Sequence, residues 1–339
     1  MAITFIHPPL RGRISGGNSY NGHIVQQAMA TGAAIFSKEL TGPLNQHCLE
    51  SLPEQQLQIW DSLFWNELSL FTEYFQHRDA AILCHSLPSM NPLLNAVEHY
   101  KLQRLEQQAI MNMKLLIATG KGLSETLQQQ YTDKPVFLCE PGVNPVYTAL
   151  QRNRCVPQKT VQVLTVANLL PAKGYRELLG QFDALSEYSW CWHIVGDDDA
   201  DPGFAARFRQ EAMELDLLAN INFHGVLKSS ALAGLMAKCD LFVFASYYEA
   251  YGIVLAEAAA NKIPVLSTRV GAAEQLFIDG RNGLLVEVGD WDYFGYCLRR
   301  LITDESWWRR LRFDTTQTPR TWLQCFAEFQ QICTRYAKD

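Results

Sequence analysis

The sequence contains 339 residues, with a formal net charge of −6 and a pI near 5.8. Hydrophobic residues make up 48% of it and charged residues 19%, which is typical of a globular protein long enough to bury more than one core. The acidic balance argues against a nucleic-acid-binding protein, because such proteins present a basic surface. The nine cysteines form no CxxC pair, and several lie in apolar runs, so we expect buried free thiols.

The N-terminal residues lack a charged leader followed by an apolar core, and the sequence has no run of 18 apolar residues. We therefore expect a cytoplasmic protein. The segment "WWRRLR" leaves open a peripheral contact with the inner face of the membrane, although helix packing explains the segment better.

Short apolar or β-branched runs recur along the chain and are separated by longer helical patterns. They lie at residues 2–7, 33–36, 80–85, 114–119, 135–140, 161–168, 189–197, 221–226, 241–246, 263–268 and 283–288. Apolar strands that alternate with helices are typical of parallel sheets covered on both faces. The two series predict an α/β protein with two doubly wound domains.

The boundary between the domains is expected at 144–159, where the chain carries two prolines, several charges and no clean periodicity. In open α/β sheets, ligands bind beyond the carboxyl ends of the strands. The residues in that position are His7, His85, Thr119, Asn168, Gly196 and Ser246 with the residues that follow it.

The stretch "EAYGIVLAE" carries two glutamates, Glu249 and Glu257, with seven residues between them. Gly252 stands where a helix is expected to begin and lets a ligand approach the backbone closely. The first amides of that helix, those of Ile253 and Val254, would form an anion site through unpaired N–H groups and the helix dipole. A nucleotide diphosphate there could offer its sugar to one glutamate and its ribose to the other. By spacing alone, two solvated glutamates explain the stretch better.

The neighbouring segments change that interpretation. "ANLLPAKG" follows the first strand of the second half, and "IPVLSTRVGAAEQLFIDGRNGLLV" follows the glutamate motif. The first half contributes the glycine pair of "SGGNSYNG", a strand that ends in a histidine, and "EPGV". In this order, the segments resemble those of the family 4 retaining glycosyltransferases of the GT-B fold (glycosyl transferases group 1, GT4). The E-x7-E motif of that family corresponds to Glu249 and Glu257, and the resemblance covers nearly the whole chain.

The resemblance implies a GT-B fold, with two Rossmann-like doubly wound parallel-sheet domains facing across a cleft. It implies an acceptor-binding domain over 1–150, with a C-terminal helix over 316–339 packing back on it, and a nucleotide-sugar-binding domain over 158–315. The implied enzyme is a hexosyltransferase that moves a sugar from a nucleoside-diphosphate sugar to a hydroxyl acceptor with retention. The expected setting is glycan, lipopolysaccharide or glycoconjugate synthesis. Residues 45–71, with a helical apolar-aromatic pattern, are candidates to shape the acceptor pocket.

The resemblance also implies a role for each site residue. Glu249 would contact the hydroxyls of the donor sugar, Lys173 would neutralise the diphosphate, and His85 would line the cleft near the sugar; these three form the expected catalytic set. Glu257 would bind the ribose hydroxyls. The expected donor-binding set consists of Gly16, Gly17, Asn168, Lys173, Gly252, Ile253, Val254 and Glu257, with the glycine pair letting the first loop approach the phosphates.

One position departs from the family pattern. Asn168 stands where the family usually has an arginine, and the loss of a cation weakens the electrostatic stabilisation of a leaving diphosphate. Three arginines are candidates to replace that charge, namely Arg269, Arg11 and Arg13.

The acidic stretch "VGDDDADPG" could hold Mg²⁺ through its carboxylates, but a solvated turn explains it better. We therefore expect no metal and no cofactor other than the donor, a UDP- or GDP-sugar. The expected partners are this donor and a glycan, lipid-linked or small-molecule acceptor, with no nucleic acid. Two alternatives remain, a non-catalytic nucleotide-sugar-binding subunit and a nucleotide-sugar 2-epimerase of the GT-B fold.

Overall fold

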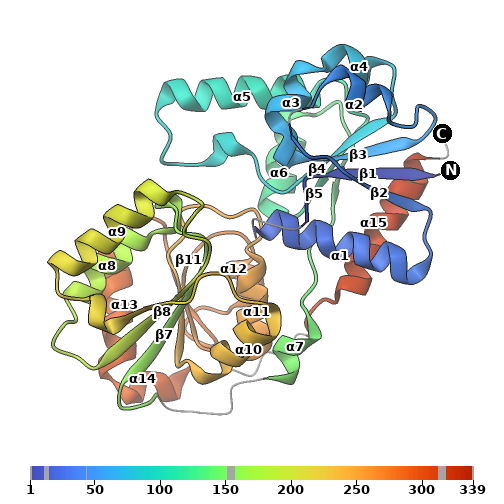
Figure 1. Cartoon of the computed structure of the whole chain (residues 1–339). Helices are drawn as coiled ribbons and strands as arrows, with labels where there is room; N and C mark the ends of the chain where they lie inside the picture. The colour runs from blue at the N-terminus through green and yellow to red at the C-terminus, as the bar shows by residue number, and fades with distance from the viewer. Residues whose placement is uncertain (1, 11–14, 43, 151–156, 312–317, 338–339) are drawn as a thin grey trace. The chain divides into compact units, whose positions relative to one another are not determined.

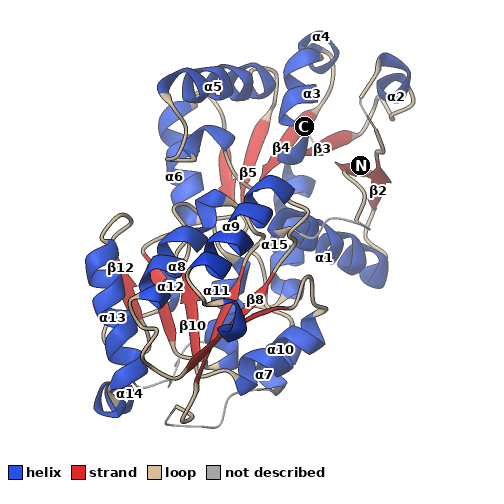
Figure 2. Ribbon diagram, turned by 60° about the vertical axis from the view of Figure 1, so that its left-hand side comes forward, coloured by secondary structure: helices blue, strands red, loops and turns tan. Residues whose placement is uncertain are grey.

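The computed structural model describes residues 2–10, 15–42, 44–150, 157–311 and 318–337. The chain divides into two compact units (Figure 1). The first consists of Met1–Gly142 and Arg320–Asp339, and the second of Val143–Pro319. In each unit the strands form one layer with helices on both faces, as Figure 2 shows for the two groups of red arrows.

The sheet of the first unit has six parallel strands in the order β2-β1-β3-β4-β5-β6. The elements of this unit, in chain order, are β1 (Ile3–His7), α1 (Gly16–Thr31), β2 (Ile35–Glu39), α2 (Gln46–Glu50), β3 (Leu57–Asp61), η1 (Ser62–Phe64), α3 (Trp65–Leu70), α4 (Thr72–Gln76), β4 (Ala80–Cys84), η2 (Pro88–Met90), α5 (Ala96–Ile110), β5 (Leu115–Ala118), α6 (Lys121–Gln130), β6 (Val136–Leu138) and α15 (Trp322–Tyr336).

The strand β3 corrects the sequence analysis. Residues 45–71 show a helical apolar-aromatic pattern, but Leu57–Asp61 form a fully buried strand between β1 and β4. The error has a physical cause. The strand holds only five residues, and helical segments flank it on both sides, so a period of 3.6 residues fits the whole stretch better than a period of two.

The helix α15 lies in the first unit, although it follows the second unit in the chain. Its first residue, Trp322, stacks on His23 of α1, with ring centroids 4.1 Å apart. Phe329, two turns further along, meets Phe5 of β1 edge-on at 5.8 Å. The helix begins with a capping box in which the Thr321 side chain accepts from the backbone amide of Gln324.

The sheet of the second unit also has six parallel strands, in the order β12-β11-β10-β7-β8-β9. The elements of this unit are α7 (Pro145–Ala149), β7 (Val161–Val166), η3 (Pro171–Lys173), α8 (Tyr175–Asp183), β8 (Trp190–Val195), α9 (Pro202–Glu214), η4 (Leu218–Asn220), β9 (Ile221–Phe223), α10 (Ser229–Lys238), β10 (Leu241–Phe244), α11 (Ile253–Asn261), β11 (Val265–Thr268), α12 (Ala273–Leu276), β12 (Leu284–Val286), α13 (Trp291–Thr303) and α14 (Glu305–Arg310).

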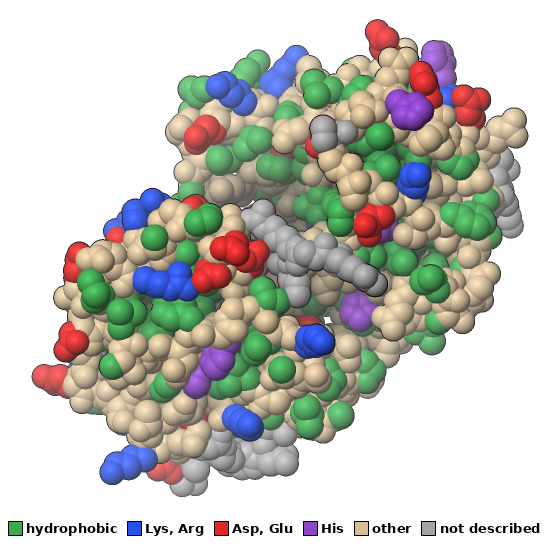
Figure 3. All heavy atoms as spheres, in the orientation of Figure 1, with side chains coloured by type: hydrophobic (Ala, Val, Ile, Leu, Met, Phe, Trp, Pro, Cys, Tyr) green, Lys and Arg blue, Asp and Glu red, His purple; other side chains and the backbone are tan. Residues whose placement is uncertain are grey.

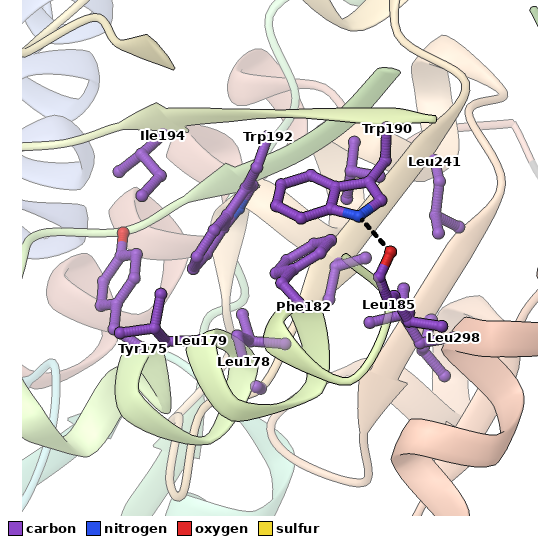
Figure 4. Close-up of a cluster of buried hydrophobic side chains, with 14 of the residues drawn as sticks. Tyr175, Leu178, Leu179, Phe182, Leu185, Trp190, Trp192, Ile194, Leu241 and Leu298 are labelled. Carbon is purple, nitrogen blue, oxygen red and sulfur yellow. Dashed lines mark hydrogen bonds between the residues drawn. The ribbon is translucent and has the colours of Figure 1, made fainter. Parts of the chain in front are cut away.

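Aromatic side chains fill the core between α8 and this sheet (Figure 4). The ring of Phe182 lies 4.6 Å from those of Trp190 and Trp192. The indole N–H of Trp190 donates to the carbonyl of Leu185 at 2.9 Å, so its burial leaves no polar atom unpaired. Trp308 of the "WWRRLR" segment is also buried in this core, which agrees with helix packing for that residue.

Val143 begins the second unit, and α7 packs on α10 and α11 within it. Residues 151–156, in the expected boundary segment, lie outside the described residues. The eight cysteines of the described part are free, as expected from the sequence. None of the helices within the described ranges combines the length and the apolar character needed to cross a membrane.

Candidate functional site

The sheet of the second unit has a switch point between β7 and β10. From β7 the sheet continues to β8 and β9, and from β10 it continues in the other direction to β11 and β12. Ligands of open parallel sheets bind at such a point, outside the carboxyl ends of the strands. The two loops there contact each other, because the amide of Tyr247 donates to the carbonyl of Ala172 at 2.9 Å.

Lys173 and Glu249 meet at this switch point. Lys173 Nζ lies 2.5 Å from Glu249 Oε1, and the two side chains keep 23% and 17% of their accessible surface. The hydroxyl of Ser246 donates to the same carboxylate oxygen at 3.2 Å. The ion pair joins residues from two loops that are 76 positions apart in the chain, and it stays accessible to a ligand.

Glycine residues hold both loops in place. Gly174 follows Lys173 with φ at 71°, and a Cβ there would lie 2.1 Å from the carbonyl oxygen of Ala245. Gly271 has φ at 56°, and a Cβ there would lie 2.3 Å from the carbonyl oxygen of Tyr251. Only glycine combines these backbone angles with such close approach. Neither glycine was expected at the site from the sequence.

The helix α11 begins beside Glu249. Gly252 precedes it in the left-handed region, with φ at 79°, and a Cβ there would lie 3.7 Å from Glu249 Cγ. The amides of Ile253 and Val254 have no acceptor among the described residues. Free N–H groups and the positive end of a helix dipole together favour negative charge at this end of the helix.

Glu257 lies one turn into α11 and is half-buried. The hydroxyl of Tyr147 donates to its carboxylate, and Ser229 donates to Tyr147. Burial raises the pKa of the Glu257 carboxyl to about 8, and the hydrogen bond from Tyr147 opposes that rise. Tyr147 was not expected at the site from the sequence. It lies 110 positions before Glu257 in the chain, so no local pattern could have indicated the contact.

The side chain of Asn168, after the end of β7, forms a hydrogen bond with the backbone of a neighbouring loop. Its side-chain oxygen accepts from the amide of Asp197 at 3.1 Å and so links the loops after β7 and β8. Arg269, a candidate to replace the missing cation, forms ion pairs with Glu274, Asp279 and Glu287 at 2.8 to 3.0 Å. Three carboxylates therefore occupy its guanidinium. The other two candidates, Arg11 and Arg13, lie outside the described residues.

The first unit gathers polar side chains at the carboxyl ends of β3 and β4. His85 follows β4, and its Nε2 lies 3.0 Å from Asn21 Oδ1 and 3.4 Å from Asp61 Oδ2. Asn21 Nδ2 donates to Asp61. The side chains of Asn21 and Asp61 are completely buried, whereas that of His85 keeps 9% of its surface.

Gly16 and Gly17 were expected in a loop, and here the structure corrects the sequence analysis. They are the first two residues of α1, whose N-cap is Ser15. Gly17 still allows a close approach, because a Cβ there would lie 3.0 Å from Cδ2 of His85. Gly17 therefore lets the start of α1 lie against the ring of His85.

Asn21 and Asp61 are further site residues that sequence reasoning missed. Asp61 is the last residue of β3, so the rule that ligands lie beyond the strand ends indicates it once that strand is recognised. Asn21 lies one turn along α1 from Gly17, and its face of the helix depends on where the helix begins.

The acidic stretch after β8 places the carboxylates of Asp197, Asp198 and Asp199 within 4.8 Å of one another. Arg209 lies 2.5 Å from Asp198 and lowers the pKa of that carboxyl. Figure 3 shows acidic side chains beside Lys and Arg side chains around α8 and α9. The ion pair with Arg209 therefore already neutralises one of the three carboxylates.

Two doubly wound parallel sheets, with a helix N-terminus and a lysine–glutamate pair at a switch point, define a protein of the GT-B class. The family model for glycosyl transferases group 1 matches residues 148–317, half of the 339 residues. The chain belongs to this family, as the sequence motifs predict.

Curated relatives point the same way. The chain is 25% identical, over 244 residues, to a D-inositol 3-phosphate glycosyltransferase from Corynebacterium glutamicum, covering 67% of this chain and 58% of that protein. It is 27% identical, over 156 residues, to the lipopolysaccharide core biosynthesis glycosyltransferase LpsE of Rhizobium meliloti, covering 46% of this chain and 43% of that protein. The chain thus spans about half the length of these relatives.

Solved structures share the fold. A sucrose-phosphate synthase from Thermosynechococcus elongatus matches with a TM-score of 0.72 and 18% identity, covering 99% of this chain and 96% of the other. HepE from Anabaena, in complex with UDP and glucose, matches with a TM-score of 0.69 and 15% identity, covering 100% and 97%. These likenesses confirm the expected GT-B fold of two Rossmann-like domains.

Proposed function

We propose that this protein is a retaining glycosyltransferase that moves a sugar from a nucleoside-diphosphate sugar to a hydroxyl acceptor. One observation carries the proposal: the Lys173–Glu249 pair lies beside the free amides at the start of α11. That arrangement offers a cation and a helix end to a diphosphate, and a carboxylate to the sugar attached to it.

The free protein and the donor complex differ in one interaction. Without donor, Lys173 and Glu249 neutralise each other. A diphosphate carries more negative charge than a carboxylate, so it attracts the lysine and leaves Glu249 available for the sugar hydroxyls. The dipole of α11 contributes about 0.3–1 kcal/mol toward binding the phosphates. Glu257, deeper along α11, accepts from the ribose hydroxyls.

The leaving diphosphate depends on Lys173 in this proposal. Asn168 carries no charge and Arg269 is held by three carboxylates, so neither replaces the arginine that the family usually has. Lys173 and the helix amides then stabilise the developing negative charge without a metal ion. The proposed donor is a UDP- or GDP-sugar, and the acceptor is a glycan, a lipid-linked glycan or a small molecule.

A lipid-linked acceptor would bring the protein to a membrane surface, and the first unit has a helix face that suits this contact. Val97 and Tyr100 of α5 keep 63% and 62% of their surface, and Leu93 before the helix keeps 47%. Lys101 and Arg104 are exposed on the same helix. Apolar and basic side chains together favour the surface of an anionic bilayer. We expect the protein to co-sediment with vesicles that contain anionic lipid. The double variant Val97→Ser, Tyr100→Ser should not co-sediment with them.

Thermal unfolding with added nucleotides tests the proposal. We expect one of UDP, GDP, ADP and dTDP to raise the melting temperature, because a ligand at 100 times its dissociation constant stabilises by about 2.7 kcal/mol. Glu257→Ala should lose that shift, and excess chelator should leave both the shift and the transfer activity unchanged. A shift with NAD⁺ alone would contradict the proposal.

A second candidate is a nucleotide-sugar-binding subunit without activity, and the engagement of Asn168 and Arg269 favours it. The same protein sample distinguishes the two functions. A nucleotide shift without any turnover of UDP- or GDP-sugars over a panel of hydroxyl acceptors supports the subunit, whereas turnover removes it.

A further inference from the structure

The side-chain amide of Asn21 and the carboxylate of Asp61 are buried beside His85 in the first unit. Asn21 comes from α1, Asp61 from the end of β3 and His85 from the loop after β4. Asn21 and Asp61 have no accessible surface. Buried polar groups are costly unless every donor finds an acceptor, so these contacts determine where the protons lie.

The hydrogen bonds fix the orientation of the Asn21 amide. The carboxylate of Asp61 accepts from the backbone amide of Leu63 at 2.6 Å and also from Asn21. The NH₂ group of Asn21 must therefore point toward Asp61. In the opposite orientation, the amide oxygen of Asn21 would face the carboxylate oxygen of Asp61, and both atoms are acceptors. Its oxygen Oδ1 then faces His85 Nε2 at 3.0 Å.

An amide oxygen only accepts, so the proton of a neutral His85 lies on Nε2. The nearby carboxylate oxygen of Asp61, 3.4 Å from Nε2, favours the same position. The other ring nitrogen, Nδ1, has no partner among the described residues. We propose that Asn21 and Asp61 are positioning residues that hold the His85 proton on Nε2 and so present Nδ1 as an acceptor to a substrate hydroxyl.

This inference rests on the proposed function, because it assigns a sugar hydroxyl as the ligand of Nδ1. Gly17 and Tyr20 fix the plane of the ring: a Cβ on Gly17 would lie 3.0 Å from His85 Cδ2, and the Tyr20 ring meets it edge-on at 5.3 Å. The ring therefore has a fixed plane and a fixed tautomer. A fixed acceptor rejects analogues that lack the hydroxyl, because Nδ1 then loses its hydrogen bond.

The proton position is measured in the free protein by ¹⁵N NMR of the histidine rings at about pH 8.5, two units above the ordinary imidazole pKa. The spectrum of His85→Gln assigns the His85 signals. We expect wild-type His85 with Nε2 protonated and Nδ1 unprotonated, and Asp61→Asn with a mixture of tautomers. Asp240→Asn is the matched control, because Asp240 is equally buried and also accepts from backbone amides, at 2.9 and 3.3 Å; it should leave the His85 signals unchanged.

The consequence for the substrate is measured with donors and acceptors that lack single hydroxyl groups. For one such analogue, wild-type protein should discriminate roughly tenfold in kcat/KM, and Asp61→Asn should lose that discrimination. Asp240→Asn should retain it.

Protonation of Nδ1 in the wild type, or an unchanged tautomer in Asp61→Asn, would overturn the inference even if the protein transfers sugars. Discrimination that is equal in wild type and Asp61→Asn would also overturn it. The proposed function is contradicted by a different result, namely that no nucleoside diphosphate binds and no sugar is transferred. In that case a sugar hydroxyl is not the ligand of Nδ1, whichever tautomer His85 adopts.

Discussion

Glu249 and Lys173 affect each other's availability to a ligand, because Glu249 Oε1 lies 2.5 Å from Lys173 Nζ. In the free protein Glu249 holds the lysine that the diphosphate needs. We expect Glu249→Gln to bind a nucleoside diphosphate at least as tightly as wild type, because the competing carboxylate is gone. Transfer should fall roughly 100- to 1000-fold, since the carboxylate near the developing positive charge is lost.

Lys173→Ala is the counterpart of that variant. It should weaken binding of the nucleoside diphosphate by roughly 10- to 100-fold, because a charge-assisted hydrogen bond is lost. Calorimetric titration of the two variants and the wild type checks both expectations. Equal losses of affinity in the two variants would contradict the competition between Glu249 and the diphosphate.

Glu257 predicts a dependence of stability on pH. In the folded protein its carboxyl keeps a proton up to about pH 8, whereas the ordinary value is 4.5. The folded state therefore binds more protons between these values, and stability falls as pH rises through them. One pKa unit corresponds to about 1.4 kcal/mol, and partial exposure reduces the effect of the full shift.

We therefore expect wild type to lose about 1–2 kcal/mol between pH 5 and pH 8 relative to Glu257→Gln. Urea unfolding of both proteins across this range provides the measurement. Parallel pH profiles for the two proteins would show that Glu257 titrates normally.

At the scale of the elements, Gly174 lets η3 and the start of α8 lie against Ala245, the residue after β10. Gly174→Ala would bring a Cβ within 2.1 Å of the Ala245 carbonyl oxygen at a φ of 71°. We expect a loss of about 1–3 kcal/mol in the free energy of unfolding, together with weaker nucleotide binding, because Lys173 moves with this backbone. Gly180→Ala is the control, since a Cβ there meets nothing within 4 Å and α8 is helical at this position; it should stabilise by about 0.5–1 kcal/mol.

The helix α15 contributes a second expectation at this scale. Trp322 is buried against α1, whereas Leu323 of the same helix keeps 56% of its surface. Trp322→Ala should destabilise by about 3–5 kcal/mol, and Leu323→Ala by less than about 0.5 kcal/mol. Equal losses of stability for Trp322→Ala and Leu323→Ala in thermal unfolding would mean that this end of α15 contributes little to the stability of the first unit.

The elements also show what the sequence could predict. Buried parallel strands have continuous apolar sequences, and eleven of the twelve strands in the described residues overlap such runs, although β2 does so only at Ile35 and Phe36. The exception, β3, contains Gln58 and ends in Asp61. Lys173 and Glu249 were expected at the site because the ordered motifs resemble those of the family, and Gly252 because a glycine stands where the helix was expected to begin. Tyr147, Asn21 and Asp61 were not, because their partners lie far away in the chain and only the folded sheets bring them together.

At the scale of the whole molecule, the two units repeat one plan. Each has a six-stranded parallel sheet with a switch point, and each places its polar side chains at the carboxyl ends of strands near that point. The alternation of strands and helices predicted this plan. The second unit is nevertheless inserted into the first, because the chain returns to the first unit at Arg320.

This insertion has a consequence during synthesis. A Cβ on Gly142 would lie 2.2 Å from the backbone nitrogen of Trp322, so the chain leaves and re-enters the first unit at neighbouring points. The face of α1 and β1 that α15 covers stays open while Val143–Pro319 are translated. At about 5–20 residues per second, that interval lasts roughly 10–35 s. Until α15 is made, a nascent first unit lacks the contacts that Phe5, Tyr20 and Cys139 form with this helix, and chaperones that bind apolar surface can act on it.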